Sequence, residues 1–315
     1  MYALRFPLRP LQTVTGLDSP IVHSRGSASL EFRYVAPQLI ITVRGLATAE
    51  EGRAFARRLW SASKWALVAH DLDSQVELDL DEPTYAKDSD QAAPNPVVES
   101  GGEASPPRQG IASGHQPVVF PESINLRFLT MGEARLIGTT PASMIVDALV
   151  EGLALPCGAE LPEDQRLRLA LDLLSAYHRE TTVSSKLVTL CMVLEVLSET
   201  TTQPYVAIEY LERWDNEVSE RLYSMDSASE DFFALDSLRR EILRRRETSK
   251  RGWVRRLILE TLGADQVDLA RRAVRAYDSR STLVHEGSIP AQELDTAETD
   301  ARDVVVQILR AKLTA

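Results

Sequence analysis

The chain reads Tyr277-Asp278-Ser279-Arg280-Ser281-Thr282-Leu283-Val284-His285-Glu286-Gly287 near the end of a helix-rich C-terminal half. This stretch places Arg280 and His285 five positions apart, and Gly287 follows as a predicted helix stop. At about 100° per residue, Ser281 lies about 100° and His285 about 140° around the helix from Arg280. The three polar groups are therefore expected to fan across one side of a helix and to point at one anion.

The apolar positions of this predicted helix define the face that packs. They are Val267, Ala270, Val274, Tyr277 and Val284, with Ser281 in the same stripe. This spacing places Arg280 and His285 on opposite edges of a buried seam, which suits a groove between two packed helices.

Histidine has an unperturbed pKa near neutrality, and arginine stays charged and grips phosphate oxygens through its planar fork. The pair therefore predicts a metal-free phosphodiester transfer, with no cofactor.

The stretch also resembles a known family. The Arg-x4-His spacing of Arg280 and His285, within Tyr-Asp-x-Arg-Ser and His-x-Gly, is similar to the motif of HEPN domains, especially the Apea-like group. The segment Lys186–Leu197, which carries Glu195, is similar to the earlier glutamate-bearing helix of that family. The resemblance covers roughly residues 140–315.

The resemblance implies an endoribonuclease in which two protomers bring their Arg/His helices together and the 2′-hydroxyl of the RNA attacks the adjacent phosphate. His285 would be the general base or acid, Arg280 would stabilise the phosphorane, and Ser281 would orient a phosphate oxygen. Active members often carry Asn, Asp or His where this chain has Ser281. The resemblance also suggests a bacterial defence or toxin–antitoxin setting, with an antitoxin or sensor partner.

Two further residues are expected to support this site. Glu195 interrupts an otherwise apolar helix stripe, so a buried Glu195 requires a partner, for which Arg280 is the candidate. Tyr277 is expected to pack in the core, with a hydroxyl within reach of the groove.

The composition indicates an ordinary globular protein with room for two cores: 315 residues, 44% hydrophobic and 26% charged. A net charge of −11 argues against a protein that coats nucleic acid or a membrane surface, so RNA contact requires a local basic patch. Cys157 and Cys191 form no disulfide or zinc pattern. The sequence has neither a signal peptide nor a membrane span, which predicts a cytoplasmic protein.

Residues 1–138 are predicted to form a small α+β domain. Its expected strands cover residues 29–34, 38–44, 75–80, 118–120 and 124–129, and its helix runs from a Thr48–Glu51 capping box to about Ala69. Residues 88–116 are rich in Pro, Ser, Gly and Glu and are expected to be a disordered insertion.

Residues 139–315 are predicted to be all helical. The expected helices cover residues 140–153, 163–179, 183–199, 204–223, 229–247, 250–262, 265–285 and 291–313. The helix at 183–199 has the strongest apolar stripe and is the expected packing partner of the Arg/His helix.

A cationic segment spans the end of the predicted helix 229–247 and the start of the helix 250–262. Its basic residues are Arg239, Arg240, Arg244, Arg245, Arg246, Lys250, Arg251, Arg255 and Arg256. Two readings stand side by side: a surface that binds the phosphate backbone of RNA, and a solvated helix face paired with the many acids of the chain. Trp253 either stacks a base or packs in the core.

Three functions therefore remain open from the sequence: a metal-independent HEPN-type ribonuclease that acts as a homodimer, a non-catalytic RNA- or nucleotide-binding module, and a dimerisation scaffold.

Overall fold

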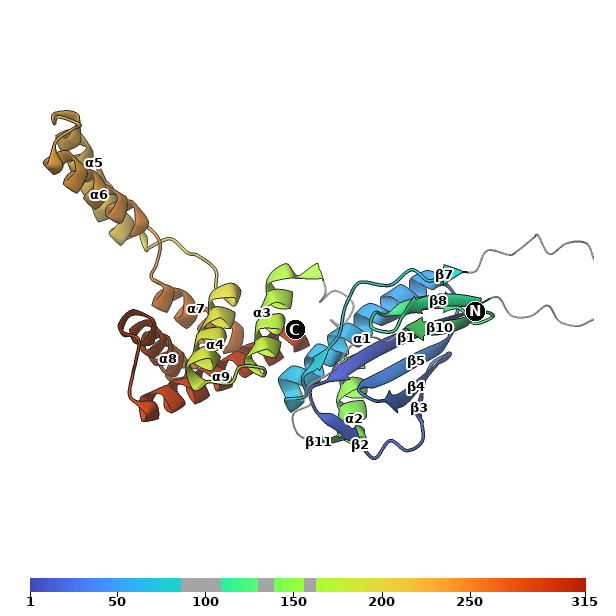
Figure 1. The fold of residues 1–315 in the computed structure, drawn as a ribbon. Helices are drawn as coiled ribbons and strands as arrows, with labels where there is room; N and C mark the ends of the chain where they lie inside the picture. The colour runs from blue at the N-terminus through green and yellow to red at the C-terminus, as the bar shows by residue number, and fades with distance from the viewer. Residues whose placement is uncertain (86–108, 130–138, 156–162) are drawn as a thin grey trace, which may run out of the picture. The chain divides into compact units, whose positions relative to one another are not determined.

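The computed structural model describes residues 1–85, 109–129, 139–155 and 163–315 (Figure 1). They form two compact units: unit 1 comprises Met1–Gln165 with Lys312–Ala315, and unit 2 comprises Arg166–Ala311. A strand-rich region is followed by a run of helices, which agrees with the predicted order of an α+β region and an all-α region.

The described residues between Met1 and Leu155 of unit 1 form strands and two helices. Its strands are β1 (Tyr2–Pro10), β2 (Thr13–Thr15), β3 (Ile21–Arg25), β4 (Ala28–Val35), β5 (Gln38–Leu46), β6 (Ser74–Gln75), β7 (Thr84–Tyr85), β8 (Gln109–Ser113), β9 (Val118–Pro121), β10 (Asn125–Leu129) and β11 (Thr139–Pro141). Its helices are α1 (Ala49–His70) and α2 (Ala142–Leu153).

The main sheet has the order β3-β4-β5-β1-β6, and β9 also pairs with β1. Neighbouring strands run antiparallel, so that Phe6 on β1, Ile41 on β5 and Phe32 on β4 lie side by side. All three side chains are fully buried, and α1 packs against β1 and β5. Alternation of buried side chains along β4 and β5 therefore produces one core face.

Helix α1 begins as predicted, because the Thr48 hydroxyl accepts a hydrogen bond from the Glu51 amide at 3.1 Å. Helix α2 packs closely on α1, where an added Cβ at Gly152 would approach Ala62 Cα to 2.7 Å. The compact unit thus extends to Gln165 and includes α2, whereas the sequence placed the boundary at residue 138. The spacing of apolar residues predicts that α2 buries one face, but it does not predict whether that face packs against unit 1 or against the helices of unit 2.

Some predicted elements of this region differ. The sequence does not predict strand β1, because this strand is buried on both faces and its apolar residues therefore do not alternate with polar ones. Within β1, the guanidinium carbon of Arg5 lies 4.1 Å from the centre of the Phe128 ring, and burial lowers the pKa of Arg5 to about 10. The predicted strand at 75–80 is limited to Ser74–Gln75, since only these two residues pair with a neighbouring strand, at Pro10 and Arg9 of β1. Residues 109–113 of the predicted disordered insertion form β8, and residues 88–108 lie outside the described part of the chain.

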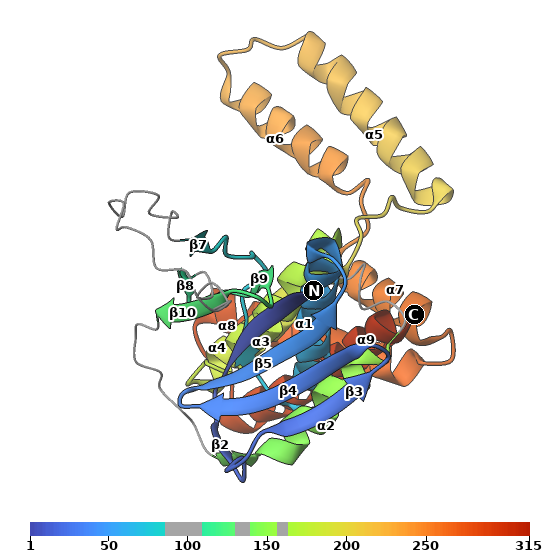
Figure 2. The ribbon, with the colours of Figure 1, turned by 90° about the vertical axis from the view of Figure 1, so that its right-hand side faces the viewer.

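Unit 2 is helical throughout its regular structure (Figure 2). Its helices are α3 (Gln165–Tyr177), α4 (Val183–Leu197), α5 (Tyr205–Tyr223), α6 (Glu230–Arg244), α7 (Lys250–Leu262), α8 (Val267–Glu286) and α9 (Ala291–Thr314). Each predicted helix is present with ends within three residues of those expected. The prolines that mark helix starts in the sequence are confirmed at Pro141 and Pro204, which are the N-caps of α2 and α5, and at Pro290, which directly precedes α9. The structure adds side-chain caps by Thr182, Ser229 and Ser249 at α4, α6 and α7.

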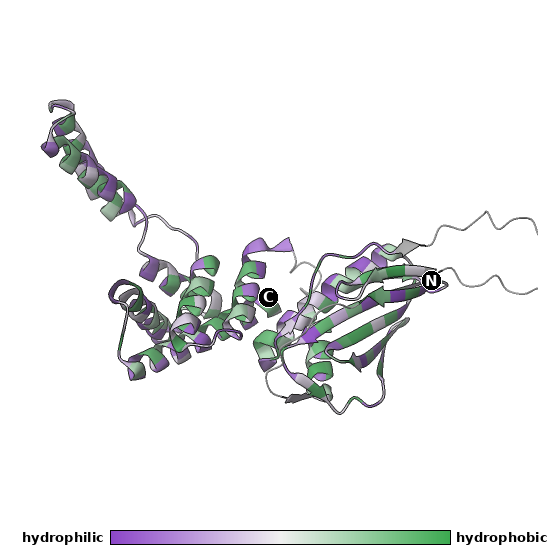
Figure 3. Ribbon diagram, viewed as in Figure 1, coloured by the Kyte–Doolittle hydropathy of each residue, from purple (hydrophilic) through white to green (hydrophobic). Residues whose placement is uncertain are grey.

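Helices α5 and α6 form an antiparallel hairpin that stands apart from the other helices of unit 2 in Figures 1 and 2. Its base is tied by backbone hydrogen bonds from Thr248 to Thr201 and from Gln203 to Arg246, each 2.8 Å. Figure 3 shows hydrophobic residues along both helices. Among the helices of the described chain, none combines the length and apolar character needed to cross a bilayer.

Candidate functional site

Helix α4 supplies the glutamate of the candidate site. The apolar stripe predicted for this helix is buried at Leu187, Leu190, Val193, Leu194 and Leu197, and its first member, Val183, is half-buried. Glu195 lies at the edge of this stripe with its side chain 26% exposed. The helix ends where the Ser198 hydroxyl donates to the Leu194 carbonyl at 2.6 Å.

Helix α8 supplies the arginine and histidine. It ends at Gly287, whose φ of 81° is the left-handed conformation that favours glycine at a helix C-terminus. The buried positions are Leu269, Ala270, Ala273, Ala276, Tyr277 and Ser279. Of the predicted stripe, Ala270 and Tyr277 are buried, whereas Val267 and Val274 are only half-buried. The stripe is wrong beyond Tyr277: Val284 is 53% exposed, and Ser279 instead turns inward and donates to Glu293 at 2.9 Å.

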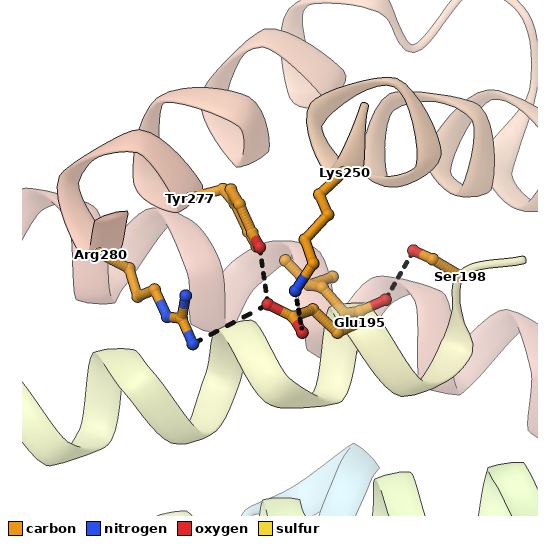
Figure 4. Close-up of polar contacts among 6 residues, drawn as sticks. Glu195, Ser198, Lys250, Tyr277 and Arg280 are labelled. Carbon is orange, nitrogen blue, oxygen red and sulfur yellow. Dashed lines mark hydrogen bonds and ion pairs between the residues drawn. The ribbon is translucent and has the colours of Figure 1, made fainter. Parts of the chain in front are cut away.

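Glu195 is the centre of a polar cluster between α4, α7 and α8 (Figure 4). The Tyr277 hydroxyl donates to Glu195 Oε1 at 2.6 Å, and Lys250 Nζ donates to Glu195 Oε2 at 3.0 Å. Arg280 Nη2 lies 3.9 Å from Glu195 Oε1. The chain directions of α4 and α8 oppose each other in Figure 4, and the predicted partnership of these two helices and of Glu195 with Arg280 is confirmed.

The cluster keeps Glu195 ionised. Partial burial acts to raise the pKa of Glu195, but the hydrogen bonds from Tyr277 and Lys250, with the charges of Lys250 and Arg280, outweigh it and lower that pKa. Burial and the bond to Glu195 raise the pKa of Tyr277, so its hydroxyl stays a donor. Burial also raises the pKa of Cys191 to about 12 despite the Arg280 charge, which leaves this free thiol unreactive.

Arg280 is held by charge and packing, while its hydrogen-bonding capacity is largely unused. The 3.9 Å between Arg280 Nη2 and Glu195 Oε1 is short enough for an ion pair but too long for a hydrogen bond. The guanidinium carbon lies 5.8 Å from the centre of the Tyr277 ring, and Nε is buried with no hydrogen-bond partner among the described residues. Glu195 thus positions the Arg280 charge, and the guanidinium fork still has donors for a further oxyanion.

Ser281 and His285 do not join this cluster. Ser281 is half-buried and His285 is exposed, and neither side chain forms a hydrogen bond or ion pair with any residue that the structure describes. The expectation that Arg280 and His285 flank a buried seam is therefore wrong for His285, because the residues at the end of α8, from Val284 to Glu286, are all exposed. Within one chain the predicted triad is not assembled.

The nearest large pocket does not coincide with the predicted site. It has a volume of about 620 Å³ and lies between α8 and α9, with Asp278, Ser279 and Glu293 in its lining. Arg280 and His285 do not contribute to it. In the described part of the chain, no group of three His, Cys, Asp or Glu side chains is placed to hold a metal ion.

The cationic segment is mostly neutralised by ion pairs. Asp215 pairs with Arg239 and Arg246, and the other pairs are Arg240–Asp236, Arg244–Glu241, Lys250–Glu195, Arg251–Asp278 and Arg256–Glu260. Arg245 and Arg255 have no carboxylate partner within the described ranges. This arrangement favours the reading of a solvated, acid-paired face, and it leaves those two arginines as candidates for phosphate contacts.

Lys250 is the site residue that the sequence did not assign to the cluster. It is separated from Glu195 by 55 positions, and no local pattern links the two. Trp253, three residues after Lys250, is half-buried, and its Nε1 is buried without a partner in the described structure, which favours the packing role over base stacking.

The Glu195 cluster predicts a pH dependence of stability. Because the folded-state pKa of Glu195 is lowered, the ionised cluster contributes stability above the unfolded-state pKa of about 4.3, and this contribution is lost as pH falls through the folded value. Chemical denaturation of the wild type and Glu195→Gln should show a stability gap at neutral pH that closes in acid. Glu199→Gln, at an exposed ion pair with Arg166, is the control and should show little gap. A Glu195 gap that stays constant from neutral pH to acid would contradict the assignment.

No model of a known protein family, no curated protein and no solved structure matches this chain. The structure itself defines the class: a strand-rich unit followed by a helical unit with a glutamate-centred cluster.

Proposed function

We propose that this protein is a metal-independent endoribonuclease of the HEPN type that serves as a bacterial defence or toxin effector. The observation that carries the proposal is the ion pair of Glu195 on α4 with Arg280 on α8. This ion pair joins the glutamate-bearing helix to the Arg-x4-His helix, and N–H donors of the Arg280 guanidinium remain without an acceptor among the described residues.

The reaction follows from the chemistry of the two α8 side chains. The RNA 2′-oxygen forms a bond to the adjacent phosphorus, and the bond from phosphorus to the 5′-oxygen breaks. His285, as neutral imidazole, takes the proton of the 2′-hydroxyl, or as imidazolium gives a proton to the leaving 5′-oxygen. Arg280 donates hydrogen bonds to the phosphorane oxygens, where negative charge develops, and Ser281 orients one of them.

The site is completed by a second copy of the chain in this proposal. His285 and Val284 are exposed at the end of α8, and Ser281 is only half-buried, so this turn is open to a facing helix. Two α8 helices related by a two-fold axis would bring Arg280 of one protomer near His285 of the other. Arg255 would contact the RNA backbone, and unit 1 would receive an antitoxin or sensor.

The direct test is cleavage of a labelled mixed-sequence RNA by the purified full-length protein in excess EDTA. The expected products carry 2′,3′-cyclic phosphate ends, because the attacking oxygen belongs to the RNA. Cleavage that stops on chelation would contradict the metal-independent mechanism, and products with 3′-hydroxyl ends would contradict attack by the 2′-hydroxyl.

A further inference from the structure

The α5–α6 hairpin leaves an unusual amount of apolar surface exposed. Along both helices only Leu211, Leu222 and Ile242 are buried. Helices of this length are marginal in water unless an apolar face is packed. Large apolar side chains nevertheless stand in solvent on both helices: Tyr205, Val206, Tyr210, Trp214, Tyr223, Phe233, Leu238 and Leu243.

Part of this apolar surface lines a groove on one face of the hairpin. The groove has a volume of about 360 Å³, and Trp214 and Leu238, each about half exposed, lie on its two sides. Val206, Tyr210 and Trp214 follow one another at intervals of four residues, so they form one stripe beside the groove. Exposed apolar patches of this kind mark interaction surfaces.

The charges of the hairpin are divided along its length. The half near the tip, residues 215–236, contains seven acidic residues and one arginine. The half near the base, residues 205–214 and 237–246, contains three acidic residues and six arginines. The ion pair of Asp215 with Arg239 marks the level at which the two halves meet.

We propose that the groove face of the hairpin docks on the same face of a second copy of this chain, with the two hairpins antiparallel. A two-fold axis at the level of Asp215 and Arg239 places the arginine-rich base of each hairpin over the acidic tip of the other. The apolar stripes then cover each other, as in a four-helix bundle. Glu217 and Arg245 line the groove on opposite sides of this level. The two-fold axis therefore places Glu217 of each copy opposite Arg245 of the other.

This interface is separate from the α8 contact of the proposed ribonuclease, and it stands whether or not the protein cuts RNA.

The first test compares two aromatic positions by sedimentation velocity of the full-length protein over a range of concentrations. Trp214→Glu should weaken self-association about 30-fold or more, because it removes a central aromatic anchor. Phe233→Glu is the matched control: Phe233 is also exposed, at 61%, but it does not line the groove, so this variant should associate as the wild type does. Circular dichroism of both variants checks that the helices are intact.

The second test uses charge reversal and does not depend on the apolar residues. In a dimer of Arg245→Glu, the new glutamate of each copy faces Glu217 of the other, and in a dimer of Glu217→Arg, the new arginine faces Arg245. Each variant alone should therefore associate more weakly than the wild type. An equimolar mixture of the two variants should associate again, because each reversed site then meets an opposite charge. Added salt should weaken association of the wild type.

A wild type that is monomeric at every concentration would overturn the inference, as would a dimer that Trp214→Glu and Phe233→Glu affect equally. A dimer that resists Trp214→Glu but is lost in Val284→Asp, at the end of α8, would also overturn it while supporting the α8 contact of the proposed ribonuclease.

Discussion

Replacing His285 by alanine is expected to reduce RNA cleavage by about 10²- to 10⁴-fold, the usual contribution of a general acid or base. The loss should appear without unfolding, since the His285 side chain is exposed and forms no hydrogen bond or ion pair with a described residue. A surface change of this kind alters stability by no more than about 0.5 kcal/mol. Initial rates on one labelled RNA in EDTA, with a thermal melt of each protein, measure both quantities.

Glu286→Ala is the matched control for this variant. Glu286 is the exposed neighbour of His285 on the same last turn of α8. Its loss should leave the cleavage rate at the wild-type level. Full activity of His285→Ala, or equal losses in both variants, would show that His285 does not carry the proton transfer.

Arg280→Lys is expected to lower the cleavage rate about 10²-fold while leaving the fold stable, because loss of one preorganised oxyanion donor costs about this much. Lysine keeps the positive charge beside Glu195, so the ion pair persists. It lacks the planar fork that binds two phosphate oxygens at once. Single-turnover rates at saturating protein separate this loss from weaker RNA binding.

This variant distinguishes a catalytic from a purely structural Arg280. If Arg280 only neutralises Glu195, lysine should support a wild-type rate, and that outcome would contradict the proposed role. Arg275→Lys is the control on the same helix, since Arg275 is exposed and lies away from Glu195. It should not change the rate.

The helices of unit 2 were readable from the sequence because their signals are local. Pro204 comes directly before α5 and is its N-cap, and Gly287 takes the left-handed conformation at the end of α8. Such caps act within a few residues, so they need no knowledge of the tertiary fold. The pairing of Glu195 with Arg280 was also predictable, because a carboxylate within an apolar stripe requires a partner.

The features that could not be predicted from the sequence depend on contacts between segments that are far apart in the chain. Lys250 reaches Glu195 across 55 positions, and α2 packs against α1 with no linker pattern to announce it. Strand β1 lacks alternation because both of its faces are buried. The inward turn of Ser279 and the exposure of Val284 follow from how α8 meets its neighbours, which periodicity alone does not fix.

The most direct test of the central claim uses an RNA oligonucleotide with one preferred cleavage position and the same oligonucleotide with a single 2′-deoxynucleotide on the 5′ side of that bond. In excess EDTA the full-length protein should cut the first and leave that bond of the second intact, because the attacking hydroxyl is missing. Equal cleavage of both, or cleavage of neither, would contradict the assignment of this chain as a metal-independent ribonuclease.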